Sequence, residues 1–108
     1  MLRKAVILAM LGLSACGSLE RRTATIAPGD TTQRVLSVLG TPGDRQFNGA
    51  LEAWQYCQTG AGFGYHDFRT IWIRDGRVVG MNSYKDHTAA SGCGGHFKSI
   101  DWSSAPHE

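Results

Sequence analysis

Apolar residues in this chain gather in one N-terminal run, one helical stripe and two alternating segments. The run occupies residues 5–13, the stripe residues 35–39, and the alternating segments residues 51–58 and 68–83. Recurrence at helical spacing predicts an amphipathic helix, and alternation predicts half-buried strands. The pattern therefore predicts one small domain of mixed α and β structure behind a separate N-terminal segment.

The helical stripe predicts a helix over residues 31–39. Asp30 suits the N-cap, and Gln33 is placed to complete a capping box. Gly40 suits the left-handed conformation that follows a last turn, and Pro42 prevents the helix from continuing. The apolar side chains of this helix share one stripe: Val35, Leu36, Val38 and Leu39.

The first alternating segment, residues 51–58, predicts a strand. Successive side chains of a strand point to opposite faces, so Trp54 and Tyr56 share one face. The other face carries Ala53, Gln55 and Cys57. The glycine-rich residues 59–67 that follow predict a loop, which lacks the lysine and the glycine spacing of phosphate-binding loops.

The second alternating segment predicts a hairpin around the Asp75-Gly76 turn. A two-residue turn would pair Ile73 with Val78 and Trp72 with Val79. One face of the hairpin would then carry Trp72, Val79 and Met81, and the other Ile71, Ile73 and Val78.

Both faces of this hairpin are partly apolar, so both need cover. The predicted helix can cover one face. For the other face two interpretations stay open: the C-terminal tail covers it, or it is an exposed binding surface. The side chains that the tail could supply are Phe97, Ile100 and Trp102.

The N-terminal run has the build of a secretory signal peptide. Arg3 and Lys4 precede the apolar residues 5–13, and small residues follow. The run is too short to cross a bilayer, which takes about 20 residues. An ordinary buried helix is the alternative interpretation.

The segment Leu13-Ser14-Ala15-Cys16 resembles the lipobox of bacterial lipoproteins. This resemblance implies that residues 1–15 are removed, that Cys16 receives a diacylglyceryl group through its thiol, and that residues 16–25 form a lipidated tether. Gly17 stands where such lipoproteins carry aspartate when they stay in the inner membrane. The expected location is therefore the outer membrane, facing the periplasm.

Charge changes this picture little. The chain holds 11 basic and 9 acidic residues, and removal of Arg3 and Lys4 leaves the two signs equal. Without an excess positive field, a nucleic-acid partner is not expected. Arg21 and Arg22 form the only local basic pair, which is either a solvated part of the tether or a contact to anionic headgroups.

Lipidation of Cys16 would leave Cys57 and Cys93, which an oxidising compartment would join as a disulfide. The alternative is a metal site built from Cys93 and His96, with Cys57, His66 or His87 added. We expect no metal and no cofactor, because no second close-spaced ligand pair exists. A nucleophile elbow is also missing, so the sequence does not indicate an enzyme.

The order of these elements resembles the SmpA/OmlA family of small outer-membrane lipoproteins, also called BamE-like. The family pattern is an isoleucine, a glycine three residues on, a threonine two further on, then a valine and a Leu-Gly-x-Pro segment, and this chain matches it with the same spacing. A Trp-x-Tyr strand and an Asp-Gly turn between hydrophobic strands follow in both. The matching residues are Ile26, Gly29, Thr31, Val35, Leu39, Gly40, Pro42, Trp54 and Tyr56.

The resemblance implies an α+β domain over residues 26–84. One or two short N-terminal helices would pack on a three-stranded antiparallel sheet, with residues 85–108 as a disulfide-tied extension. It also implies an accessory protein of outer-membrane β-barrel assembly, which binds other barrel-assembly lipoproteins and anionic phospholipid. The alternative is a stand-alone periplasmic binding or inhibitor module on the same fold.

The glycine-rich loop is the predicted place of partner binding. Exposed aromatic side chains flanked by glycine make adaptable contacts. The predicted partner-binding residues are Phe63, Tyr65 and His66.

Overall fold

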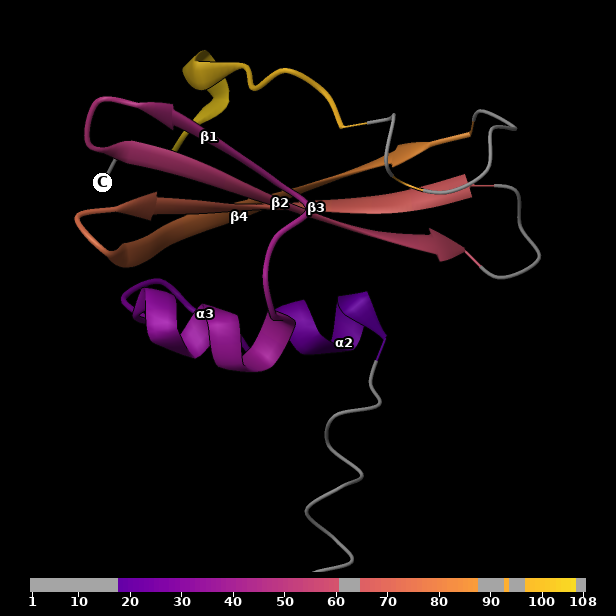
Figure 1. The fold of residues 1–108 in the computed structure, drawn as a ribbon, viewed down its shortest axis with the longest axis horizontal. Coiled ribbons are helices and arrows are strands. Elements are labelled where there is room, and N and C mark those ends of the chain that lie inside the picture. The colour runs from indigo at the N-terminus through magenta and orange to yellow at the C-terminus, as the bar shows by residue number, and fades with distance from the viewer. Residues whose placement is uncertain (1–17, 61–64, 88–92, 94–96, 107–108) are drawn as a thin grey trace, which may run out of the picture.

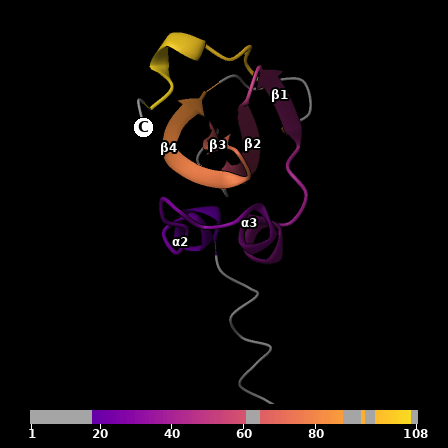
Figure 2. The ribbon, with the colours of Figure 1, turned by 90° about the vertical axis from the view of Figure 1, so that its left-hand side faces the viewer.

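The computed structural model describes residues 18–60, 65–87, 93 and 97–106. These residues form an α+β domain of three layers (Figure 1). Two helices cover one face of an antiparallel sheet, and the C-terminal tail crosses the opposite face (Figure 2). The helices are α2 (Leu19–Thr23) and α3 (Thr32–Leu39), and a 3-10 turn, η2 (Trp102–Ser104), lies in the tail.

The sheet has four strands, not the three that the family resemblance implied. Its strands are paired in chain order: β1 (Asp44–Asn48), β2 (Leu51–Gly60), β3 (Tyr65–Arg74) and β4 (Arg77–Asp86). The additional strand is β1, an edge strand with the sequence DRQFN. It has no apolar alternation to reveal it, because most of its side chains face solvent.

Helix α2 occupies residues that were expected to be a polar tether. Leu19 and Thr23, one turn apart, are 2% and 1% exposed. The Thr23 hydroxyl donates to the backbone oxygen of Leu19 at 2.9 Å, so this polar side chain is satisfied inside its own helix. The Leu19 N–H donates to Gln58 Oε1 at 2.5 Å, which fixes the helix to β2. Five residues are too few to show helical periodicity, so the sequence pattern missed this helix.

Helix α3 matches the predicted helix, except at its first turn. Thr31 is the N-cap, and its hydroxyl accepts from the Arg34 N–H at 3.1 Å. Asp30 instead accepts from the Ala27 N–H at 2.9 Å, which shapes the turn before the helix. Gly40 ends the helix with a positive φ of 78°, as predicted, but its ψ of −165° is extended and not that of the left-handed helical conformation.

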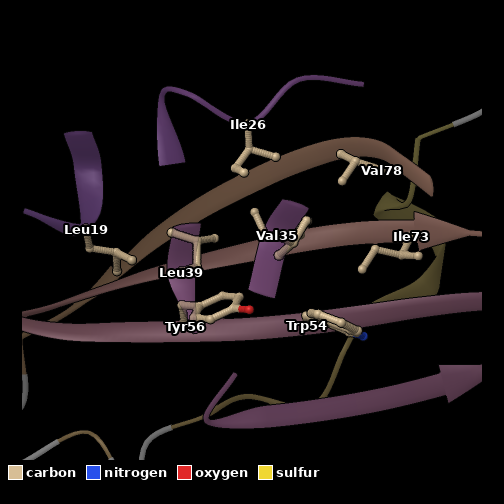
Figure 3. Packing of buried hydrophobic residues seen from close by; sticks show 9 residues of the cluster. Leu19, Ile26, Val35, Leu39, Trp54, Tyr56, Ile73 and Val78 are labelled. Carbon is tan, nitrogen blue, oxygen red and sulfur yellow. The ribbon is translucent and has the colours of Figure 1, made fainter. Parts of the chain in front are cut away.

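The main hydrophobic core lies between the helices and the sheet (Figure 3). Trp54 and Tyr56 share this side of β2, as the alternation predicted. Val38 and Met81 pack against the cluster from its margin. Its buried members are Leu19, Ile26, Val35, Leu39, Trp54, Tyr56, Ile71, Ile73 and Val78.

The tail builds a second, smaller core on the opposite face. Trp102 packs edge-on against the buried Trp72, with ring centroids 5.9 Å apart. Further along, Phe97 meets the ring of Phe68 edge-on at 5.4 Å. Ile100 also packs against the cluster around Trp72. Of the two interpretations of this face, cover by the tail is therefore the one that the structure supports.

The β3–β4 hairpin turns at Asp75-Gly76, but its register differs from the prediction. Ile73 pairs with Val78 as expected, whereas Trp72 pairs with Gly80 and not with Val79. The register shift makes Val79 an extra residue, a β-bulge. Met81 consequently joins the helix-side core, not the face of Trp72.

Candidate functional site

The residues of the family-like motif mainly build the fold. Five of them lie in the helix-side core: Ile26, Val35, Leu39, Trp54 and Tyr56. Pro42 is half-buried after the end of α3. The Tyr56 hydroxyl donates to the backbone oxygen of Gly40 at 2.8 Å, which ties β2 to the end of the helix. Burial raises the pKa of Tyr56 well above its ordinary value, and the nearby Arg45 only partly offsets this.

Gly29 and Thr31 attach the start of α3 to the edge of the sheet. The Gly29 N–H donates to Val78 O at 2.7 Å, and the Val78 N–H donates to Asp30 O at 2.8 Å. Thr31 forms an isolated bridge with Arg77. Gly29 has φ 94°, a conformation that side chains with a Cβ rarely adopt. These contacts explain the motif structurally and leave the binding surface to other residues.

The predicted partner-binding residues are placed differently from the expectation. Residues 65–67 belong to β3, so the predicted loop of residues 59–67 is too long. His66 is 3% exposed, so its ring is not an exposed contact. Tyr65 is half-buried, with Lys85 Nζ 4.7 Å from its ring centre and the ring of His87 at 5.9 Å. Phe63 lies outside the described residues.

The most exposed aromatic side chain that the structure describes is on β1. Phe47 is 60% exposed. The guanidinium carbon of Arg45 lies 5.1 Å from the ring centre of Phe47 and 4.8 Å from that of Trp54. Arg45 also pairs with Glu52 at 3.0 Å, and Glu52 accepts from Trp54 Nε1 at 2.9 Å. We call Arg45, Phe47 and Glu52 the β1 surface.

The β1 surface has the composition of a protein-binding site. Arginine and aromatic side chains dominate the energetics of protein interfaces. Arg45 contacts the buried Trp54 and pairs with Glu52, and these two contacts fix the position of its guanidinium beside the Phe47 ring. The sequence signal that could have revealed this strand is Gly49, because glycine suits the first position of a two-residue hairpin turn, and Gly49-Ala50 is the turn between the paired Asn48 and Leu51.

A polar network joins the tail to the centre of the sheet. Gln55, fully buried, donates to Asp44 Oδ2 and to the backbone oxygen of Lys98, both at 2.8 Å. It accepts from the Tyr84 hydroxyl at 2.6 Å. Burial raises the pKa of Tyr84, although the Lys98 N–H bonded to it acts in the opposite direction.

A cavity of about 280 Å³ lies beside this network. Trp72 lines it, and the indole N–H of Trp72 is buried without a hydrogen-bond partner among the described residues. The other lining residues include Thr70, Asn82 and Ser104. The volume is just below the range of about 300–1,000 Å³ that is typical of small-molecule pockets.

The predicted disulfide between Cys57 and Cys93 is present, with the two Cα atoms 5.9 Å apart. It ties the tail to β2. His66 stands beside it, since the metal-binding atoms of Cys57, His66 and Cys93 all lie within 4.8 Å of one another. His87 is not part of this group among the described residues, and His96 lies outside them.

Comparisons with models of known protein families, with curated proteins and with solved structures give no match. Within the described ranges, no helix is long and apolar enough to span a membrane.

Proposed function

We propose that this protein is a lipid-anchored accessory of the outer membrane that acts in envelope or β-barrel assembly by binding a partner protein, without catalysis. The observation that carries the proposal is the β1 surface. Phe47 is 60% exposed, so burial of its ring against a partner would remove a large apolar area from water and favour binding. The lipobox-like segment and the family-like motif supply the compartment and the kind of partner.

The start of the folded domain fits a short anchor. Ser18 caps α2, and Leu19 is already buried. Only Gly17 lies between Cys16 and Ser18, so the chain between them reaches at most about 7 Å. A lipid on Cys16 would therefore hold the domain directly at the membrane surface. Arg21 on α2 and Arg34 on α3 are exposed and could meet anionic headgroups as a secondary contact.

The proposal is tested by capturing partners from cross-linked envelopes with the full-length tagged chain and its Phe47→Ala variant. Leu36→Ala is the matched control, because Leu36 is the other exposed large hydrophobic residue that the structure describes, at 43%. We expect Phe47→Ala to reduce capture of barrel-assembly subunits at least about tenfold, and Leu36→Ala to leave it unchanged.

Both variants should keep the melting temperature of the parent chain, since neither side chain is buried. Equal capture by Phe47→Ala and the parent would contradict the role of the β1 surface. Capture of a soluble periplasmic protein in place of assembly subunits would favour the stand-alone binding or inhibitor module. Binding of the same chains to anionic vesicles is measured in parallel. If Phe47→Ala weakens vesicle binding but leaves protein capture unchanged, the β1 surface contacts lipid and not a protein.

A further inference from the structure

The sheet and the tail bring three potential metal ligands together at one end of the domain. Cys57 lies on β2, His66 on β3 and Cys93 in the tail. In the strand register, Cys57 faces Phe68 and Thr59 faces His66, so the cysteine and the histidine come from neighbouring strands on the tail side. Both cysteines are half-buried and within reach of a reductant, whereas the imidazole is 3% exposed.

The separations suit a tetrahedral zinc ion once the two sulfurs are no longer bonded. Zinc binds thiolate at about 2.3 Å and imidazole at about 2.0–2.1 Å, which places neighbouring ligand atoms roughly 3.5–3.8 Å apart. The three ligand atoms already lie within 4.8 Å of one another. Two thiolates and one imidazole leave the fourth position for water or another ligand.

A carboxylate is placed where metal-binding histidines usually have one. Asp86 on β4 is the direct cross-strand partner of His66 on β3. Cross-strand partners point to the same face with their Cβ atoms about 4.5–5.5 Å apart. A carboxylate beside the imidazole fixes the orientation of the ring and raises its basicity as a ligand.

We propose that reduction of the Cys57–Cys93 disulfide converts this cluster into a zinc site formed by Cys57, Cys93 and His66, with Asp86 supporting the histidine. A dithiol supplies two electrons and two protons, becomes a disulfide itself and leaves two thiols on this chain. Binding of Zn²⁺ to these thiols then releases two protons as two Zn–S bonds form. This inference does not depend on the proposed assembly function.

The two states would hold the tail in different ways. In the oxidised state the disulfide ties Cys93 to β2. In the reduced state zinc would make the same connection and extend it to His66 on β3. Only when the protein is both reduced and free of metal would Cys93 have neither a covalent nor a metal-mediated link to the sheet.

The test uses the full chain with Cys16→Ser, so that Cys57 and Cys93 are the only thiols. After reduction by a phosphine, the chain is titrated with Co²⁺, which gives thiolate charge-transfer absorption, and then with Zn²⁺. We expect one Co²⁺ per chain, displacement by Zn²⁺, and a rise in the melting temperature of the reduced chain only. The oxidised chain should show no thiolate absorption.

Three variants assign the ligands. His66→Gln should weaken Zn²⁺ binding at least about 100-fold, and Asp86→Asn about 10–100-fold. His87→Gln, the matched control on a neighbouring exposed histidine, should bind like the parent chain. The melting temperature of each oxidised variant checks that it folds. Absence of Co²⁺ binding by the reduced parent, or equal affinity in His66→Gln, would overturn the proposal, as would loss of binding in His87→Gln.

Discussion

Two buried polar side chains in this domain donate hydrogen bonds to the backbone of distant segments. The Tyr56 hydroxyl meets Gly40 at the end of α3, and the Gln55 amide meets Lys98 in the tail. Without its hydrogen bond, each of these buried polar groups would lose its bonds to water and gain none in the protein, which would destabilise the fold. These bonds also fix where α3 ends and where the tail runs over the sheet.

Removal of the Tyr56 hydroxyl tests the first of these bonds. Tyr56→Phe keeps the ring in the core but leaves Gly40 O without its donor. We expect the free energy of unfolding to fall by about 1 kcal/mol at pH 7. Urea denaturation measures it, and an unchanged value would show that the bond does not contribute.

The same tyrosine predicts how stability responds to alkaline pH. Burial raises the pKa of Tyr56, and of Tyr84 in the same direction. The folded chain therefore keeps protons that the unfolded chain loses near pH 10. Stability is unaffected below that pH, and above it Tyr56 removes up to about 1.4 kcal/mol per pH unit, while Tyr84 acts in the same direction. Denaturation at pH 9 and 11 should show the loss, and a smaller loss in Tyr56→Phe. Equal losses in the two chains would exclude Tyr56 as the source.

At the scale of elements, the sequence predicted the helix and strands whose apolar residues recur at a regular spacing, and it missed the short or polar elements that lack such a pattern. The α3 stripe and the alternation of β2 were sufficient to place Val35, Trp54 and Tyr56 in the core. The short α2 and the polar β1 give no periodic signal, so the predicted tether and three-stranded sheet were wrong. Without β1, sequence reasoning also missed Phe47 and placed binding on residues such as His66, which is buried.

The bulge in β4 had a local signal that counting from the turn ignored. Gly80 interrupts the short apolar stretch of β4, between Val79 and Met81, and such a glycine often marks a bulge or a close approach of another segment. Both hold here. A Cβ at Gly80 would overlap the ring of Pro106, and one at Gly43 would lie 2.5 Å from Phe97 Cζ. The tail therefore packs directly against two glycines, Gly80 in β4 and Gly43 just before β1.

A methyl group at Gly80 should lift the tail. Gly80→Ala is expected to lower the free energy of unfolding by about 1–3 kcal/mol, since the proline ring cannot bend away. Pro106→Ala removes that ring. In the Pro106→Ala background, Gly80→Ala should therefore lower the free energy of unfolding much less than it does in the parent chain. Strictly additive effects in this cycle would mean that the two residues do not touch.

At the scale of the whole molecule, the sheet lies between two helices on one side and a tail that is covalently tied on the other (Figure 2). A domain this small has a modest core, so the cross-link contributes a sizeable share of its stability. The disulfide was predictable from the count of cysteines and the expected compartment. The presence of buried His66 beside it was not, because it depends on the pairing of β3 with β2.

Reduction of the disulfide should cost stability in proportion to the loop that it closes. The cysteines are 36 residues apart, for which chain entropy gives a loss of about 2–4 kcal/mol. In the presence of a chelator, reductant should lower the melting temperature by roughly 10–25 °C. The Cys57→Ser and Cys93→Ser double variant should melt at one temperature with or without reductant. A parent chain that melts equally in both conditions would mean that the cross-link does not stabilise it.

Whether the domain works at the outer membrane through a lipid on Cys16 is tested most directly by the mass of the intact chain in separated envelope membranes. We expect the chain in the outer-membrane fraction, starting at Cys16 and carrying the mass of a diacylglyceryl group with or without a further acyl chain. Recovery of a soluble chain from the periplasm, with Cys16 unmodified or removed, would contradict the anchor and with it the proposed function.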